Sequence, residues 1–290
     1  MIKDNTADHI TTEEARQLID DLNNSLGMDG LRFVTGMGYR HLLIWDNGPV
    51  DTITTPPHDV PDQPVQTYLP KGNRHDEVIK LMEESKRILS NHPVNQVRIK
   101  AGKNAATQIW LWGQGRKTFL PSYQKMYGLT GSVISAVDLV KGIGLLAGLK
   151  AVQVPGATGF IDTDFAGKVK AAMDVLSEHD FVFVHVEAPD ECSHMGNLNL
   201  KIKAMEAFDR EIVGPIWQCL QTRGEAYRLV IGTDHRTPVV RRCHTAEPVP
   251  IALLEGPVSP TNAEAQFDEF VNGGHVSGMA FELLQTVLKR

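Results

Sequence analysis

The sequence predicts an α/β protein made of two parts, residues 1–125 and residues 126–290. A chain of 290 residues exceeds one typical core, so two domains are expected. After about residue 125, short apolar runs alternate with helical patterns, which is typical of a doubly wound sheet. Before that point, a few helix and strand signals surround a proline-rich stretch, which predicts a separate α+β domain.

Four segments are expected in the first part. They are a helix over 11–26, a strand over 39–46, an extended irregular loop over 54–73 and a helix over 74–91. Thr11 or Thr12 can cap the first helix, and Gly27 can end it. Asp46-Asn47-Gly48 predicts a hairpin turn after the strand, and His92-Pro93 should stop the second helix.

The second part is expected to alternate strands and helices. Strands are predicted over 131–135, 151–154, 181–187, 227–233 and 249–254, and helices over 139–149, 166–179, 198–223 and 277–289. The third and fourth strands are apolar on both faces, as strands covered by helices on each side should be. Because ligands of such sheets sit at the carboxyl ends of the strands, the chemistry is expected there.

Composition excludes several functional classes. The chain is 42% hydrophobic and 22% charged, with a net charge of −6 and no basic block that would indicate nucleic-acid binding. It has no apolar run long enough to predict a membrane span, and it opens without the apolar core of a signal peptide. Its three cysteines, Cys192, Cys219 and Cys243, are sparse and irregularly spaced, which favours a reducing cytoplasm over a disulfide framework.

Three clusters of metal-ligating residue types follow expected strand ends. Asp190 and His194 are four residues apart, so one helical turn would place them on the same side. Asp234 and His235 directly follow the fourth strand, and His244 comes shortly after them. Two carboxylates and three imidazoles suit zinc or manganese.

Each cluster alone also has a simpler interpretation. Asp190 and His194 could be a helix cap and a surface histidine, Asp234-His235 could form a turn, and His244 could be a hydrogen-bonded residue in the core or at the surface. The combination favours a metal site because all three clusters lie where an α/β fold builds its sites. Two metal ions bridged by one phosphate need about six or seven ligands, so five leave the set one or two short.

The same residues, and further stretches along nearly the whole chain, resemble a known family. The similar stretches are Tyr39-Arg40-His41-Leu42-Leu43, Thr55-Pro56-Pro57-His58-Asp59, His92-Pro93-Val94-Asn95, 109–115, 134–144, 154–159, 185–191 and Asp234-His235-Arg236-Thr237-Pro238. They resemble the archaeal-type 2,3-bisphosphoglycerate-independent phosphoglycerate mutases of the alkaline phosphatase superfamily. The resemblance implies an alkaline-phosphatase-like doubly wound core over 126–290. It also implies an inserted α+β substrate-binding lid over 1–125, incomplete at its N-terminus.

The resemblance also implies a mechanism. Asp190, His194 and His244 would hold one divalent ion, and Asp234 and His235 would hold a second. Mn²⁺ is the first choice, with Zn²⁺ or Mg²⁺ as alternatives. A serine on the second metal would take the phosphate of 3-phosphoglycerate and return it to give 2-phosphoglycerate, a step of glycolysis and gluconeogenesis. That serine and an aspartate would come from an upstream segment that this sequence lacks, so the isolated chain is expected to be truncated and inactive.

The substrate would be a small phosphorylated three-carbon acid, and five residues are candidates to bind it. Arg40 and Arg116 come first because a guanidinium binds phosphate and carboxylate through two hydrogen bonds. His41, Asn95 and Lys141 are secondary candidates. Arg40 could equally form a salt bridge at a strand edge, and Lys141 could be a solvated surface lysine. His275 is most simply a turn residue, and the sequence does not predict an oligomeric state.

Two other functions remain open at this point. The chain could be a metal-dependent phosphomonoester hydrolase of the same superfamily, or an inactive fragment that binds phosphometabolites or a partner. The long first part favours a mutase, since a lid keeps the intermediate in place and excludes water. A kinase would need a phosphate-binding P-loop, and Gly142-Ile143-Gly144 lacks the rest of that motif.

Overall fold

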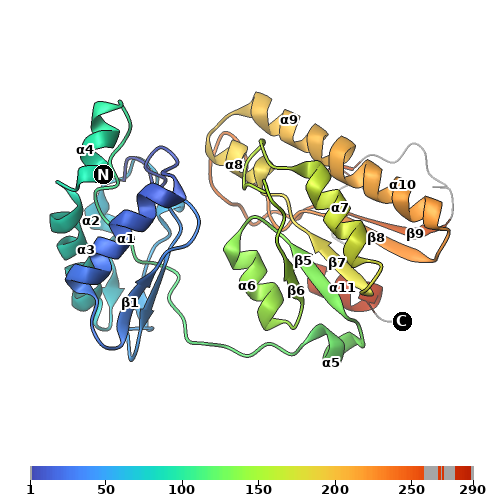
Figure 1. The fold of residues 1–290 in the computed structure, drawn as a ribbon, viewed down its shortest axis with the longest axis horizontal. Helices are drawn as coiled ribbons and strands as arrows, with labels where there is room; N and C mark the ends of the chain where they lie inside the picture. The colour runs from blue at the N-terminus through green and yellow to red at the C-terminus, as the bar shows by residue number, and fades with distance from the viewer. Residues whose placement is uncertain (1, 258–266, 269, 271–277, 289–290) are drawn as a thin grey trace. The chain divides into compact units, whose positions relative to one another are not determined.

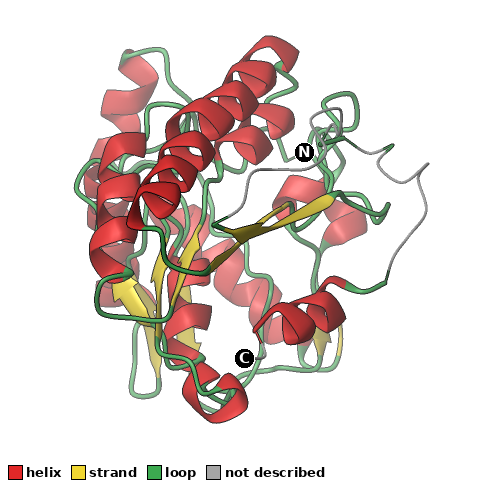
Figure 2. Cartoon of the chain, turned by 90° about the vertical axis from the view of Figure 1, so that its right-hand side faces the viewer, coloured by secondary structure: helices red, strands yellow, loops and turns green. Residues whose placement is uncertain are grey.

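The computed structural model describes residues 2–257, 267–268, 270 and 278–288 (Figures 1 and 2, where the other residues are grey). The chain divides into two compact units, Met1–Thr118 and Phe119–Arg290. Among the described residues, none of the helices combines the length and the apolar character needed to cross a bilayer.

The first unit packs helices against small antiparallel sheets. Its elements are α1 (Thr12–Leu26), β1 (Leu31–Val34), β2 (Leu42–Trp45), β3 (Thr52–Ile53), η1 (Pro57–Asp59), α2 (Val65–Tyr68), β4 (Lys71–Gly72), α3 (His75–Leu89) and α4 (Pro93–Lys100). The core joins the apolar face of α1 to β1 and α3. Its buried members include Ala15, Leu18, Ile19, Leu22, Leu31, Phe33, Leu81 and Leu89.

Helix α1 confirms the predicted start and end. The Thr11 side chain accepts a hydrogen bond from the Glu14 backbone N–H, and the Glu14 carboxylate accepts one from the Thr11 N–H. This capping box satisfies two amide donors that a helix N-terminus leaves unpaired. Gly27 follows the last turn, and its N–H donates to the Asn23 carbonyl.

Replacing Thr11 with alanine should lower the stability of the first unit by about 1 kcal/mol, because the cap is lost. Hydrogen exchange of the α1 amides measures this change locally. Ser25→Ala, an exposed site in the last turn of the same helix, is the matched control. Equal protection of α1 in both variants would show that the capping box does not stabilise the helix.

The prediction of a hairpin after residues 39–46 is wrong. Asn47 does adopt a left-handed turn conformation, with φ of 56°. However, β2 pairs antiparallel with the preceding strand, β1, with Leu31 opposite Trp45 and Val34 opposite Leu42. The strand β1 is four residues long and was missed. Its position is fixed by Asn23 of α1, whose side-chain amide bonds both the N–H and the carbonyl of Phe33.

The proline-rich stretch is more regular than expected, since 54–73 contains η1, α2 and β4, and β4 pairs with β3. The second helix ends as predicted, because α3 stops at Leu89. Pro93 then begins another helix, α4, for which the His92 side chain accepts from the Val94 N–H. Proline is well tolerated in the first turn of a helix, where its missing N–H has no intrahelical partner.

All five strands predicted for the second unit are present. The elements are α5 (Tyr123–Tyr127), β5 (Gly131–Ile134), α6 (Asp138–Leu146), β6 (Lys150–Val152), α7 (Phe165–Val175), β7 (Phe181–Val184), α8 (Ala188–His194), α9 (Leu198–Phe208), the π-helical turn η2 (Asp209–Val213), α10 (Gly214–Arg223), β8 (Tyr227–Gly232), β9 (Ile251–Gly256) and α11 (Ala280–Leu288). Helix α11 corresponds to the helix expected over 277–289, whose first and last residues lie outside the described part of the chain. His275 also lies outside the described residues.

A parallel sheet in the order β6-β5-β7 forms the centre of the second unit (Figure 1). The central strand β5 is buried along its whole length. On one face, Ile134 packs with apolar side chains of α7, η2 and α10. On the other face, α6 lies so close to Val133 that a Cβ on Gly144 would approach it to 2.5 Å. Helices therefore cover both faces of β5, the arrangement of a doubly wound sheet, although the sequence predicted such coverage for the third and fourth strands.

The last two strands differ from the expected single parallel sheet. β8 and β9 pair antiparallel, with Tyr227 opposite Gly256 and Gly232 opposite Ile251, and form a two-stranded sheet of their own. The expectation that helices cover both faces of the strand at 181–187 is also only partly right, because Phe183 is 45% exposed. Apolar runs show that a segment is a strand, but not which partner it pairs with or in which direction.

The helix expected over 198–223 is confirmed as one continuous helical segment with a π turn inside it. Pro215 explains the interruption, because it has no N–H to donate to the carbonyl four residues earlier. The short helix α8 was not among the predicted helices. It nevertheless supplies the one helical turn that the spacing of Asp190 and His194 implies.

Candidate metal centre

Helix α8 places two of the predicted ligands on one side. It begins beside the carboxyl end of β7, with Glu187 at its N-cap and Pro189 in its first turn. Asp190 and His194 are one turn apart, and the His194 Nε2 lies 3.2 Å from the Asp190 Oδ2. The helix therefore presents a carboxylate and an imidazole to the same small volume.

His244 joins this pair from a distant segment. Its Nε2 lies 3.0 Å from the His194 Nε2 and 3.5 Å from the Asp190 Oδ1. In a tetrahedral zinc site, bonds of about 2.0–2.1 Å separate neighbouring ligand atoms by about 3.3–3.4 Å. The two nitrogens and the carboxylate are thus spaced like three ligands of one metal ion.

Asp234 and His235 lie beside this group. The rings of His235 and His244 have centroids 3.9 Å apart, and Asp190, His235 and His244 each offer a ligand atom within 4.8 Å of the others. The Asp234 Oδ2 lies 3.4 Å from the His235 Nε2. The five residues expected from the sequence to be ligands therefore form one continuous group.

Backbone contacts orient His194. Its Nδ1 lies 2.9 Å from the Arg242 carbonyl oxygen, which can only accept, so Nδ1 carries the proton and the neutral ring keeps its lone pair on Nε2. In return, the Arg242 Nε donates to the His194 carbonyl at 2.8 Å. Arg242 has a left-handed backbone with φ of 56°, and this turn leads directly to His244.

The electrostatics of the site lower the pKa of Asp190 and raise the pKa of His194. Burial alone would raise the pKa of Asp190, but hydrogen bonds from His194 and Thr237 and the charges of His194 and His244 outweigh it and lower it to about 2. The hydrogen bond to Asp190 raises the pKa of His194, against a smaller opposing effect of burial. In the metal-free protein, Asp190 therefore favours protonation of His194, and His194 favours ionisation of Asp190.

Asp190 should make the stability of the metal-free protein depend on pH. Its lowered pKa stabilises the fold fully above the ordinary value of 3.8, and this contribution is lost as the pH falls towards about 2. The raised pKa of His194 stabilises the fold fully below 6.5, and that contribution is lost as the pH rises through the raised value. The pair therefore contributes most between about pH 4 and pH 6.5, by about 2 kcal/mol.

The variant Asp190→Asn tests this by urea unfolding at several pH values without metal. The wild-type protein should exceed the variant in stability near pH 5, and this difference should shrink on acidification. Glu206→Gln, on an exposed position of α9, controls for the loss of a carboxylate. A difference between wild type and Asp190→Asn that stays constant across the pH range would contradict the pairing.

A buried layer supports the start of α8. Lys168 is 1% exposed, and its Nζ donates to the His185 carbonyl at 3.1 Å. The His185 ring lies 3.1 Å from the Ser135 Oγ and 3.2 Å from the Glu187 Oε2. Burial lowers the pKa of both Lys168 and His185, and the Glu187 charge partly opposes this for Lys168. These contacts fix the carboxyl end of β7, from which α8 starts.

The cluster fits a divalent cation on its own chemistry. The lone pair of His194 Nε2 points at a second imidazole nitrogen 3.0 Å away and at an ionised carboxylate. Such facing lone pairs repel one another unless a proton or a cation lies between them. Imidazole nitrogen and carboxylate oxygen are common ligands of Zn²⁺ and Mn²⁺.

Comparison with known proteins identifies the family. The family model described as the Metalloenzyme superfamily matches residues 3–285. A probable 2,3-bisphosphoglycerate-independent phosphoglycerate mutase of Geobacter sulfurreducens is 44% identical over 292 residues, which cover 100% of this chain and 73% of the relative. The 2,3-bisphosphoglycerate-independent phosphoglycerate mutase of Methanosarcina mazei is 44% identical over 270 residues, which cover 93% of this chain and 68% of the relative. The chain belongs to this mutase family.

Solved structures support the fold of this family member. A protein of Pyrococcus horikoshii matches with a TM-score of 0.64 and 25% identity, covering 86% of this chain and 60% of that one. A cofactor-independent phosphoglycerate mutase of Thermoplasma acidophilum matches with a TM-score of 0.52 and 23% identity, covering 95% and 69%. The predicted family and α/β fold class are confirmed, and membership of a metalloenzyme superfamily agrees with a divalent metal site.

The substrate candidates of this mutase-family chain lie in both units. In the first unit, Arg40 is exposed and its guanidinium lies 4.3 Å from the centroid of the Tyr39 ring, while Arg116 is exposed on the loop after α4. His41 accepts from the Gly36 N–H, and burial lowers its pKa. In the second unit, Lys141 on α6 pairs with Asp138 at 2.7 Å.

Asn95 is a correction to the predicted substrate residues. Its side chain is 0% exposed. The amide nitrogen donates to the carbonyls of Leu89 and Ala106, and the amide oxygen accepts from the Ala106 N–H. Because these bonds use both donors inside the core, Asn95 has a structural role in holding the segment after α4 against α3.

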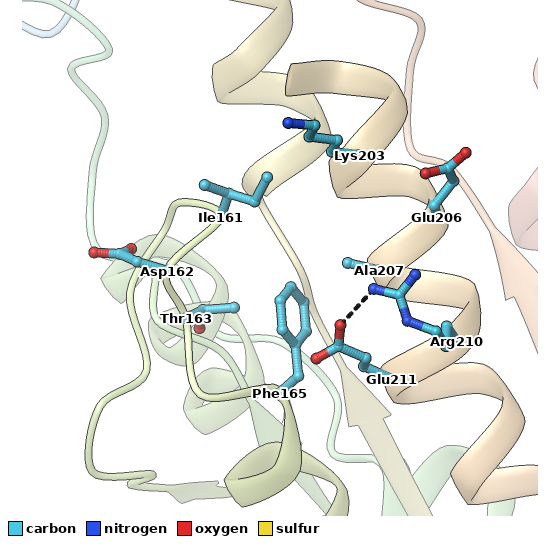
Figure 3. A pocket seen from close by; sticks show the side chains of 9 residues that line it. All are labelled: Ile161, Asp162, Thr163, Phe165, Lys203, Glu206, Ala207, Arg210 and Glu211. Carbon is cyan, nitrogen blue, oxygen red and sulfur yellow. Dashed lines mark hydrogen bonds and ion pairs between the residues drawn. The ribbon is translucent and has the colours of Figure 1, made fainter. Parts of the chain in front are cut away.

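A surface hollow elsewhere in the second unit lies between the 161–165 loop and helices α9 and η2 (Figure 3). It is lined by Ile161, Asp162, Thr163, Phe165, Lys203, Glu206, Ala207, Arg210 and Glu211. Its charges are mixed, and Arg210 pairs with Glu211 at 2.8 Å. None of the predicted site residues lines it, so the metal centre and this hollow are separate features.

Sequence reasoning missed several residues that support the candidate metal centre. Thr237, Arg242 and Lys168 all make contacts that connect segments far apart in the chain. Thr237 lies two residues after His235, within the stretch 234–238 that resembles the family, and this position could have drawn attention to it.

Proposed function

We propose that the protein interconverts 3-phosphoglycerate and 2-phosphoglycerate by metal-dependent phosphoryl transfer. The convergence of Asp190, His194 and His244, with ligand atoms 3.0–3.5 Å apart, is the observation that carries the proposal. Family membership supports it, since the relatives described above are a probable and a named 2,3-bisphosphoglycerate-independent phosphoglycerate mutase.

In this proposal, the five clustered residues hold two divalent cations. Asp190, His194 and His244 bind one ion, and Asp234 and His235 contribute to the second. Mn²⁺ is the first choice because the set mixes carboxylates with imidazoles, while Zn²⁺ and Mg²⁺ are alternatives. The bound ions would supply the neutralisation of charge that phosphoryl transfer chiefly requires.

The residues of the chain position the ligands and the substrate. Arg242 and Thr237 orient the ligand side chains of the cluster. Arg40 and Arg116 are proposed to bind the phosphate and carboxylate of the substrate, with His41 and Lys141 as further contacts. A guanidinium suits this task because its paired N–H groups match the spacing of two anionic oxygens.

The transferred phosphate is proposed to rest on a serine between the two half-reactions. Two hydroxyls near the centre are poor candidates for this nucleophile. Thr237 bonds Asp190, and Ser193 is 0% exposed and donates to the Pro189 carbonyl at 2.7 Å. The first test therefore measures metal and substrate binding, which do not depend on a nucleophile.

The experiment titrates the metal-free chain with Mn²⁺ by calorimetry, then adds 3-phosphoglycerate with and without the metal. We expect saturable Mn²⁺ binding and substrate binding that requires it. Because Thr237 and Ser193 are poor nucleophiles, we expect a coupled enolase assay to detect little formation of 2-phosphoglycerate by this chain alone, and a phosphate assay measures hydrolysis. Absent Mn²⁺ binding, or release of inorganic phosphate as the main product, would overturn the mutase proposal, and the latter would favour a hydrolase.

A further inference from the structure

We propose that Thr237 is a positioning residue that joins the two parts of the metal centre. Its hydroxyl links Asp190, a ligand of the first ion, to His235, a ligand of the second. In doing so it fixes which ring nitrogen of His235 carries the proton. This inference rests on the proposed metal centre.

The direction of the hydrogen bonds follows from the chemistry of the three groups. The Thr237 Oγ1 lies 2.5 Å from the Asp190 Oδ1 and 3.2 Å from the His235 Nδ1. An ionised carboxylate can only accept, so the single hydroxyl proton points to Asp190. The hydroxyl can then only accept from His235, so the proton of the neutral ring lies on Nδ1.

This arrangement leaves the lone pair of His235 on Nε2, the nitrogen that lies towards Asp234. The Asp234 Oδ2 is 3.4 Å from Nε2, and by itself it would favour the opposite tautomer with a proton on Nε2. Asp234 is 77% exposed in its side chain, whereas Thr237 is 5% exposed, so solvent weakens the competing contact. Thr237 therefore decides the tautomer.

Thr237 is itself held at the junction of the segments that form the centre. Lys201 of α9 donates from its Nζ to the Thr237 carbonyl at 2.9 Å. The preceding residue, Arg236, forms an isolated β-bridge with Thr245, which directly follows His244. Thr237 thus connects α8, the loop after β8 and the loop that carries His244. A change at Thr237 should therefore alter the binding of both ions.

The test compares Thr237→Val, which keeps the shape but removes the hydroxyl, with Thr237→Ser, which keeps the hydroxyl. Thr237→Ala is a second variant without the hydroxyl, in case the valine variant does not fold. Thr163→Val is the matched control. Thr163 is also 5% exposed, and its hydroxyl accepts from the Thr158 N–H at 3.0 Å, so it loses a comparable buried bond away from Asp190.

Two measurements are made on each variant. Long-range ¹⁵N–¹H correlation spectra of the metal-free protein, near pH 8.5 where an ordinary imidazole is neutral, report the tautomer of His235, assigned with His235→Gln. Calorimetry reports Mn²⁺ affinity. We expect the Nδ1–H tautomer in the wild type and a shift towards Nε2–H in Thr237→Val.

Mn²⁺ affinity should fall about 10- to 100-fold in Thr237→Val and return to within about threefold of wild type in Thr237→Ser. Thr163→Val should match the wild type in both measurements. An unchanged tautomer in Thr237→Val, or a serine variant that behaves like the valine variant, would overturn the inference. If the wild type binds no Mn²⁺, the proposed function fails, while the metal-free spectra still decide the role of Thr237.

Discussion

Replacing His244 with alanine should lower the affinity for Mn²⁺ about 10- to 100-fold. Each of the four ligands of a structural zinc site contributes about 3 kcal/mol, or roughly 100-fold in affinity, and Mn²⁺ binds the same ligand types more weakly than Zn²⁺ does. His244 contacts both His194 and Asp190 at ligand spacing, and its ring centroid lies 3.9 Å from that of His235. Its loss should therefore affect both proposed ions, and calorimetric titration of the metal-free protein measures the change.

His179→Ala is the control for this prediction. His179 precedes β7, at the amino end of the strand, whereas the metal cluster follows the carboxyl end. The control loses an imidazole from the same unit but should bind Mn²⁺ like the wild type. Equal affinities in His244→Ala and His179→Ala would show that His244 is not a ligand.

Replacing Arg98 with methionine should destabilise the first unit by about 3 kcal/mol. Arg98 is 1% exposed in its side chain and pairs with Glu14 at 2.7 Å. It also donates to the carbonyls of Asn104 and Ala7. Methionine would fill much of the volume but leave these acceptors without their donor, including the carboxylate that completes the capping box of α1.

Native-state hydrogen exchange of the α1 and α4 amides measures this loss within the first unit. Arg16→Met is the matched control, because Arg16 also pairs with a glutamate of α1 but is 52% exposed in its side chain. An exposed pair of this kind contributes at most about 0.5 kcal/mol. If the α1 amides are protected from hydrogen exchange equally in Arg98→Met and Arg16→Met, the buried network around Arg98 does not stabilise the unit.

Local signals in the sequence were sufficient for most elements of the fold. The Thr11 cap and Gly27 define α1, and the apolar runs of the second unit define β5 to β9. The failures concern short elements such as β1 and α8, which were missed, and the partners of the strands. Asp46-Asn47-Gly48 has the composition of a hairpin turn, yet β2 pairs with β1 because Asn23 anchors β1 to α1. The antiparallel pairing of β8 and β9 is likewise invisible in their composition.

The candidate metal ligands could be recognised in the sequence from their residue types and spacing. Asp190 and His194 are one helical turn apart, and Asp234-His235 directly follows a strand. Substrate residues were harder to predict, since an amide such as that of Asn95 serves the backbone as readily as a ligand. Arg242 and Lys168 act through backbone carbonyls, which no sequence pattern reports.

By itself, the sequence determined the α/β class, the family resemblance and the five residues expected to bind metal, because these depend on periodicity and on residues close together in the chain. Only the tertiary structure decided that His244 lies 3.0 Å from His194 and that Thr237 connects Asp190 to His235. The physical reason is that hydrogen bonds act over about 3 Å in space, whereas His244 and His194, like Thr237 and Asp190, are some fifty positions apart along the chain.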